Sequence, residues 1–326
     1  SFYLLGVGYL YVLTGSLNMF DVANRLVDLQ GNPAMWLSLV FMVAGLGLKM
    51  ALFPMHLWLP DAYTYASSTS TAIIAPLMTK VSAYVMIRVL YFVYGHEWSL
   101  HGAGGLGPVI TWMALAGIVV GSIMAIAQKD AKRMLAYSSI AQVGYIGVGI
   151  GLATPLALVG AMLHILNHAI MKSCLFLVTG SVQLQADTVR LRDYTGLGRR
   201  MPWTFAAFTL AALAMVGIPP TNGFFSKWYL VLGGIAAGQW VVVVLILASS
   251  LLTAIYFFRV LERIYAGPAP EGDDGGAARA VVDPPLSMRA PVLVLGIGVL
   301  ALGLANAWLV STILRLALPA DLPWPL

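Results

Sequence analysis

Charged residues are scarce in this sequence, and cysteine is nearly absent. Only 10% of the 326 residues are Asp, Glu, Lys or Arg, whereas 60% are hydrophobic. A soluble globular domain carries about 25% charged residues, so the composition predicts a polytopic membrane protein. The single cysteine, Cys174, excludes a disulfide within the chain and a CxxC metal or redox site.

The sequence also lacks the usual signatures of catalysis. It contains no HExxH motif, no carboxylate dyad and no Gly-rich phosphate loop after a strand. No residues are arranged to bind NADH, flavin, an iron–sulfur cluster or nickel, so we expect no cofactor, no metal and no redox or hydrolytic site in this chain. The net charge of +5 does not indicate nucleic acid, because the basic residues lie in short loops between apolar runs.

Nine apolar runs are long enough to cross the ~30 Å hydrocarbon layer as helices. They show no apolar–polar alternation, which favours helices over a β-barrel. They cover residues 1–18, 34–53, 71–94, 107–128, 135–153, 154–180, 203–236, 239–262 and 289–316. We therefore predict an all-α membrane protein. Residues 1–265 form its membrane domain, 266–288 a flexible cytoplasmic loop, and 289–326 a last transmembrane helix with a tail.

The basic residues of the loops fall almost entirely on one side of these runs. The loops at 19–33, 95–106 and around 237 hold only Arg25. The other side holds Lys129, Lys132, Arg133, Arg190, Arg192, Arg199, Arg200, Arg263, Arg279 and Arg289. Basic loops stay in the cytoplasm, so these loops and Ser1 are predicted to be cytoplasmic. Ser1 opens in mid-run without a signal peptide, and we expect further helices before it.

All thirteen carboxylates fall in loops or at the ends of runs, and the ionisable residues within the runs are basic. The set comprises Lys49, Lys80, Arg88, His164, His168, Lys172, Lys227 and Arg259. A lysine at the bilayer centre costs about 2.5–3.5 kcal/mol. Arg88 and Arg259 lie near run ends, where long side chains extend to the headgroups. Five others are too deep, or too close to a helix break, for that explanation: Lys49, Lys80, His168, Lys172 and Lys227.

His164, His168 and Lys172 repeat every four residues within "HILNHAIMK". This spacing puts them on one helix face, in a slanted row about 12 Å long. Imidazole gains and loses a proton near neutral pH, so the row predicts a proton relay. The alternative is that each group merely hydrogen-bonds a neighbouring helix, which is the commoner role of a single buried histidine.

Two runs contain helix breakers, and each has a lysine nearby. Pro54 and Pro60 interrupt residues 47–63, the first of them five residues after Lys49; Pro219, Pro220 and Gly223 interrupt residues 216–230, just before Lys227. Broken helices persist in membranes only inside protein or beside a water-filled cavity, and paired breaks indicate the ion path of a transporter. We therefore add Lys49 and Lys227 to the predicted path, together with Lys80, which is another lysine deep within an apolar run.

Four segments together resemble a known family. They are "KMALFPMHLWLPDAYTYASSTSTAIIAPLMTKVSAYVMIR" (49–88), "AQKDAKRMLAYSSIAQVGY" (127–145), "HILNHAIMKSCLFLVTGSV" (164–182) and "GIPPTNGFFSKWYL" (217–230). They resemble the antiporter-like membrane subunits shared by respiratory complex I, membrane-bound hydrogenases and Mrp-type Na⁺/H⁺ antiporters. The opening stretch, residues 3–23, looks most like the D-type member of the Mrp antiporters.

The resemblance implies a fourteen-helix fold with two inverted five-helix repeats, of which this chain is the C-terminal part. By motif, Lys49 matches the lysine of the seventh helix, Lys80 the bridging lysine of the eighth, and Lys227 the terminal lysine of the twelfth. His164, His168 and Lys172 match the central relay of the eleventh helix. The glutamate that pairs with the lysine of the seventh helix would precede Ser1, so we expect a missing segment or a separate chain to supply it.

The function implied is a proton-translocating subunit of a multisubunit Na⁺/H⁺ antiporter in a bacterial or archaeal plasma membrane. Its expected partners are other membrane subunits, protons, the lipid bilayer and, as a candidate, Na⁺, but no nucleic acid. The alternative is a pumping subunit of an NADH-quinone oxidoreductase or membrane-bound hydrogenase, whose redox chemistry resides on other chains. A third possibility is a scaffold whose lysines have only packing roles.

Overall fold

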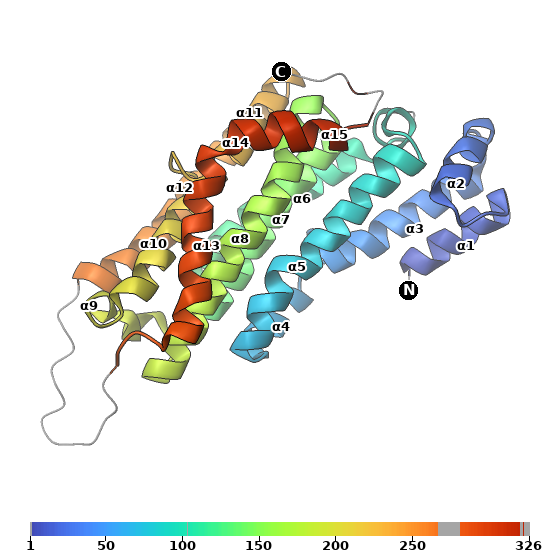
Figure 1. Cartoon of the computed structure of the whole chain (residues 1–326). Helices are drawn as coiled ribbons and strands as arrows, with labels where there is room; N and C mark the ends of the chain where they lie inside the picture. The colour runs from blue at the N-terminus through green and yellow to red at the C-terminus, as the bar shows by residue number, and fades with distance from the viewer. Residues whose placement is uncertain (1, 103, 267–280, 320–321, 323–326) are drawn as a thin grey trace, which may run out of the picture.

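The computed structural model describes residues 2–102, 104–266, 281–319 and 322, and Figure 1 shows them as a bundle of long helices. Its first half comprises α1 (Phe2–Thr14), α2 (Met19–Leu26), η1 (Val27–Leu29), α3 (Pro33–Met50), α4 (Trp58–Tyr65), α5 (Ser68–Ile87), η2 (Arg88–Val93), η3 (Glu97–His101), α6 (Gly107–Ala127) and α7 (Ala131–Gly151). The second half comprises α8 (Pro155–Ala186), η4 (Leu191–Tyr194), α9 (Leu197–Arg200), α10 (Pro202–Val216), α11 (Asn222–Ala236), α12 (Trp240–Ala266), α13 (Leu286–Leu304), α14 (Asn306–Trp308), η5 (Leu309–Leu314) and α15 (Arg315–Ala317).

The all-α membrane architecture predicted from composition is confirmed. In the described residues, seven helices are long and apolar enough to cross a membrane, and the pair α1–α2, bent by 63°, would make an eighth. The predicted run 203–236 is not one helix. It is divided into α10 and α11, each 15 residues long. The residues between them, 217–221, include Pro219 and Pro220, and we call them the second break.

The last predicted run, 289–316, also differs from the structure. Its spanning helix, α13, covers only Leu286–Leu304, and residues 306–317 then turn across one end of the bundle (Figure 1). We call residues 306–317 the lateral segment. Leu309, Val310 and Leu314 of this segment pack on α8. Hydropathy detected the apolar run but carries no information on its direction. Most of the loop predicted at 266–288 lies outside the described residues.

Helices α7 and α8 form the centre of the bundle. α8 contacts α5, α7, α10, α11 and α13. In α7, 94% of an 18-residue membrane-spanning stretch is buried inside the protein. Because α7 faces protein rather than lipid, it tolerates polar residues such as Ser138, Ser139 and Gln142, all fully buried. The bundle therefore has a polar interior surrounded by apolar helices.

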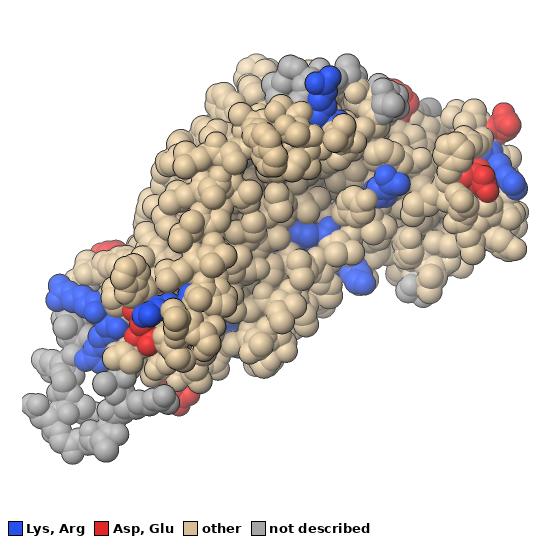
Figure 2. All heavy atoms as spheres, in the orientation of Figure 1, with Lys and Arg blue, Asp and Glu red and all other residues tan. Residues whose placement is uncertain are grey.

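The basic loops gather at one end of the molecule, which we call the basic end. Figure 2 shows lysines and arginines clustered there, around the position of α9 in Figure 1. Arg133 of α7 pairs with Asp61 of α4 at 3.3 Å, which ties the two helices together there. Arg259 of α12 contacts the end of α6: its Nη2 donates to the carbonyl of Ile126 at 2.8 Å.

The second break is packed tightly against α13, and this contact yields a prediction. A Cβ added at Gly303 would lie 2.0 Å from the carbonyl oxygen of Pro220, whereas one at Gly298 would meet nothing nearer than 3.9 Å. We expect Gly303→Ala to destabilise the protein by about 1–3 kcal/mol through overpacking. Thermal unfolding in detergent should show a lower Tm for Gly303→Ala and an unchanged one for the control Gly298→Ala; equal Tm values would contradict this packing.

Candidate functional site

The row predicted on α8 exists in the structure. His164, His168 and Lys172 are all fully buried, and the two imidazole rings lie 5.7 Å apart and nearly parallel. The helix that carries them begins with Thr154 as N-cap, whose side chain accepts from the amide of Ala157, and with Pro155 in its first turn. Both residues favour helix initiation at this point, and the row faces α7 and α11.

Lys227 lies on α11, and its ammonium group reaches backbone oxygens at the end of α10, beside the second break. α10 ends at Val216 and Gly217 has a φ of +94°, so the carbonyls of the last turn lack partners within the helix. The Nζ of Lys227 donates to the carbonyls of Met215 and Val216 at 2.9 and 3.0 Å, and to the hydroxyl of Ser250 at 3.2 Å. The negative end of the α10 dipole thus stabilises the cation.

Tyr145 of α7 connects Lys227 to the row. The Nζ of Lys227 lies 4.9 Å from the centroid of the Tyr145 ring, and that ring lies 5.5 Å from the ring of His164. The Nδ1 of His164 shares a hydrogen bond of 2.8 Å with the hydroxyl of Ser226, one residue before Lys227. The second break and the row are therefore in direct contact.

Lys172 forms the other end of the row, and Lys80 lies on α5, which packs against α8. The Nζ of Lys172 donates to the carbonyl of Leu135 at 2.7 Å and to the hydroxyl of Ser138, whereas the Nζ of Lys80 donates to the carbonyl of Ala75 at 2.8 Å. Within the described residues, however, no hydrogen bond joins one of these basic groups directly to the next.

Lys49 does not lie among these buried basic residues. α3 ends at Met50, and Lys49 is exposed, with no partner for its ammonium group among the described residues. Of the residues predicted to break the helices, Pro54, Pro219 and Pro220 do lie between helices. Pro60 and Gly223 instead lie in the first turns of α4 and α11.

Gly223 lies where the start of α11 meets the end of α10. A Cβ there would stand 1.9 Å from the carbonyl oxygen of Ala214. Only glycine therefore lets the start of α11 approach the end of α10. This approach brings Lys227 to the free carbonyls.

Gln142 is a site residue that the sequence analysis did not single out. Helices α7 and α8 are consecutive and antiparallel, and Ser138 contacts Lys172 while Tyr145 contacts His164. This register puts Gln142, four residues after Ser138, level with His168. The spacing of Ser138, Gln142 and Tyr145 along one face of α7 is a signal that could have identified it.

Several buried polar atoms of the site have no protein partner in the described structure. They include both ring nitrogens of His168, the Nε2 of His164, the Oδ1 of Asn167, both amide atoms of Gln142 and the Oγ1 of Thr79. Buried polar atoms of this kind are normally satisfied by ordered water. The buried charged groups are exclusively basic in the described part of the chain, with no Asp or Glu among them.

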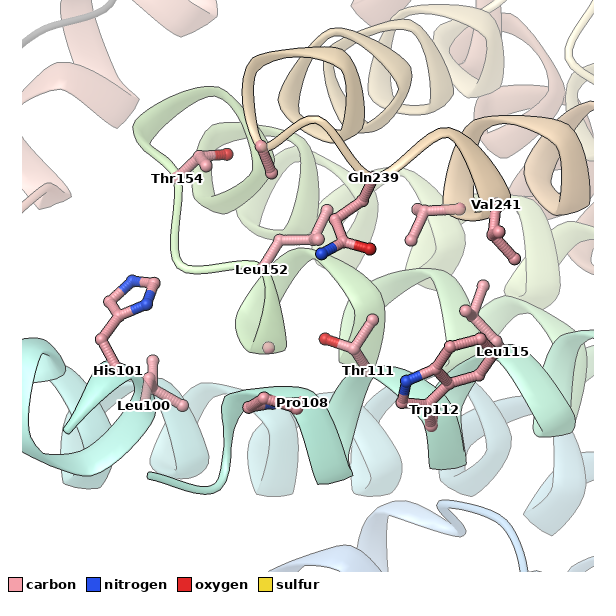
Figure 3. A pocket seen from close by; sticks show the side chains of 13 residues that line it. Leu100, His101, Pro108, Thr111, Trp112, Leu115, Leu152, Thr154, Gln239 and Val241 are labelled. Atoms are coloured by element: carbon pink, nitrogen blue, oxygen red, sulfur yellow. The ribbon is translucent and has the colours of Figure 1, made fainter. Parts of the chain in front are cut away.

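A pocket opens at the end opposite the basic loops. It has a volume of about 380 Å³, and Figure 3 shows His101, Thr111 and Gln239 around it. Gly151 of α7 also lines it, six residues or about 9 Å of helix from Tyr145. Apolar side chains of one cluster, Leu115, Val148 and Ile246 among them, surround Tyr145 on this side. The pocket therefore approaches the site without opening into it.

The unpartnered atoms lead to a structural prediction. In a high-resolution map of the protein in lipid, we expect ordered water within hydrogen-bonding distance of Gln142 and His168, because unsatisfied groups there would each cost about 1–3 kcal/mol. Gln142→Leu should remove part of this density. The control Ser139→Ala should not, since the Ser139 hydroxyl bonds the Leu135 carbonyl of its own helix. A dry interior in the unsubstituted protein would contradict the prediction.

Comparison with known proteins agrees with these features. A family model described as "NADH:quinone oxidoreductase/Mrp antiporter, TM" matches residues 1–253. The N-type subunit of the NADH-quinone oxidoreductase of Desulforudis audaxviator is 53% identical over 99% of this chain. The D-type subunit of the Na(+)/H(+) antiporter of Alkalihalophilus pseudofirmus is 33% identical over 81%. The chain spans 65% and 52% of the length of these two relatives.

A solved structure has the same fold. A chain of the Mrp complex from a Dietzia species superposes with a TM-score of 0.83 at 26% identity, covering 95% of this chain and 63% of that one.

Proposed function

Because this chain belongs to the family of membrane subunits shared by NADH:quinone oxidoreductases and Mrp antiporters, we propose that it translocates protons through the buried bases of α8 and α11. The chain acts as one subunit of a larger membrane complex, and its basic end faces the cytoplasm of a bacterial or archaeal cell. The redox or cation chemistry that drives transport resides on other chains.

The relative identities support the quinone-oxidoreductase type of complex over the antiporter type. Identity is 53% to the relative from an NADH-quinone oxidoreductase and 33% to the relative from a Na⁺/H⁺ antiporter, and coverage of this chain is also higher for the first. The function that the sequence motifs ranked second is therefore the one we propose. The likeness of residues 3–23 to the Mrp antiporters is a feature of a single short stretch and does not outweigh identity along the whole chain.

The observation that carries the proposal is the continuous contact from Lys227 through Tyr145 and His164 to His168. These groups come from three helices, α7, α8 and α11, and only a few ångströms separate them. Apolar residues would fill these positions at a lower free-energy cost, because each buried amine or imidazole must be desolvated. A set of neighbouring bases in contact is what proton transfer through bound water requires.

The mechanism follows from the partners of the bases. The ammonium groups of Lys172 and Lys227 are held by carbonyl and hydroxyl oxygens, and that of Lys80 by a carbonyl. Among the described residues no carboxylate neutralises these three groups. Two unit charges 5.7 Å apart, the separation of the two imidazole rings, interact by about 3 kcal/mol at an effective dielectric near 20. A proton arriving at one base therefore repels the proton on the next. This energy exceeds the roughly 2.3 kcal/mol per charge that a 100 mV membrane potential supplies.

A substitution experiment tests the proton path. We expect Lys227→Met, and likewise Lys80→Met, to lower proton translocation at least tenfold in vesicles containing the assembled complex, because each removes a protonatable group while keeping side-chain volume. Lys129→Met, at an exposed position of the basic end, is the control and should translocate as the unsubstituted protein does. The readout is the pH-gradient signal, with assembly monitored by gel filtration. Normal translocation in both buried-lysine variants would refute the path.

A second experiment tests the type of complex. We expect the chain to co-purify with subunits that carry iron–sulfur clusters, and proton translocation to depend on quinone reduction and not on a sodium gradient. Electron paramagnetic resonance of the purified complex detects the clusters directly. A complex without clusters whose proton flux requires Na⁺ would return the assignment to the antiporter while leaving the Lys227 and Lys80 predictions in force.

A further inference from the structure

Arg88 is an arginine within an apolar run that the proton path does not use. It lies twenty residues after the first residue of α5, which is about 30 Å of helix and equals the thickness of the hydrocarbon layer. Because Ser68 starts α5 at the basic end, Arg88 stands at the opposite membrane boundary. That side is poor in basic residues, so an arginine here is an exception to the charge pattern of the chain.

The guanidinium of Arg88 is oriented by an aromatic ring. Its Cζ lies 4.4 Å from the ring centroid of Phe92, one helical turn onward. Stacking occupies the flat face of a guanidinium and leaves its N–H edge available for a bidentate acceptor. No carboxylate of the described residues forms an ion pair with it.

A groove of about 360 Å³ begins beside this guanidinium. Tyr84 and Arg88 line it from α5 and its continuation η2, Met162 and Ile165 from α8, and Leu316 and Ala317 from the lateral segment. Met162 and Ile165 lie seven and ten residues after the start of α8, about 10 and 15 Å below the membrane boundary. The groove thus has one charged end at headgroup level and apolar walls that extend into the hydrocarbon layer.

The lateral segment is itself suited to the membrane boundary. The side chains of Trp308 and Leu316 are 60% and 85% exposed, while Leu309 and Leu314 pack on α8. Exposed tryptophan and leucine at this depth contact the region between headgroups and acyl chains. The segment therefore covers the groove from the headgroup side.

We propose that this groove binds one anionic phospholipid, with its phosphate on the Arg88 guanidinium and an acyl chain along Met162 and Ile165. The charged arginine lies at the depth of the lipid phosphate, and the apolar walls below it lie at the depth of the acyl chain. Such a lipid would join α5 to α8 and to the lateral segment. The site does not depend on the proposed proton path.

Lipid titration of the delipidated, purified complex tests this proposal. Native mass spectrometry would count dioleoyl-phosphatidylglycerol or dioleoyl-phosphatidylcholine bound as each is added. We expect Arg88→Gln to weaken the tightest phosphatidylglycerol binding about tenfold, since it removes a charge-assisted hydrogen-bond donor, and Arg88→Lys to weaken it less. Ala317→Trp, which places an indole at the mouth of the groove from an exposed position, should weaken the binding of both lipids.

Arg199→Gln is the control, because Arg199 is an exposed arginine at the basic end. It should bind phosphatidylglycerol as the unsubstituted complex does. The proposal is overturned if Arg88→Gln and Ala317→Trp both retain the original binding, or if the unsubstituted complex does not distinguish the two lipids. It is also overturned if Ala317→Cys crosslinks to a partner chain in the intact complex, since a polypeptide would then fill the groove.

Discussion

A cation in the middle of a hydrocarbon layer requires oxygen atoms, and the break between α10 and α11 provides them for Lys227. Three features cooperate. Gly217 ends α10 with a positive φ and leaves carbonyls free, Gly223 lets α11 approach the end of α10, and Gly303 lets α13 pack against the break. Without this local geometry Lys227 would be a desolvated charge without partners, and neither its burial nor its contact with Tyr145 would be tolerated.

The same requirement explains the character of α7. A helix that contacted lipid could not carry Ser138, Gln142 and Tyr145 along one face, but α7 is surrounded by protein. Its small residues allow this enclosure, since a Cβ at Gly144 would come within 2.6 Å of the carbonyl oxygen of Ala114. Close packing of α6 on α7 thus places polar groups opposite α8, where Lys172, His168 and His164 lie. The polar interior and the glycine-rich packing are two aspects of one arrangement.

Parts of this arrangement follow from the sequence because they are local. The four-residue spacing of His164, His168 and Lys172 dictates a common face, and the prolines at 219 and 220 dictate a break, whatever surrounds them. Lys49 shows the limit of such reasoning. Like Lys227, it is a lysine near a proline break, yet it is exposed among the described residues, and its place in the path stays a prediction. The lateral segment differs from prediction because the turn after Leu304 depends on which helices pack beside it, and sequence spacing does not encode that.

Gln142 could be identified from the sequence, since it shares a helix face with Ser138 and Tyr145. A neutral amide in an apolar run is a weaker signal than a lysine, because it carries no charge. Its position level with His168 emerges only from the antiparallel register of two helices. The polar groups that matter for hydration are therefore harder to predict than the charges that they serve.

The choice of partners for the buried lysines has a functional consequence. A carboxylate would neutralise an ammonium group but would also hold its proton in a strong ion pair. Carbonyl dipoles and hydroxyls stabilise the cation without cancelling its charge, so Lys227, Lys172 and Lys80 remain sensitive to one another. In the described structure these amines do not touch, and the imidazoles of His164 and His168 lie between them. The Nε2 of His164 and both ring nitrogens of His168 lack protein partners. The arrangement therefore separates two tasks: the lysines carry charge that responds to neighbouring charge, and the histidines with bound water provide the connection along which a proton moves.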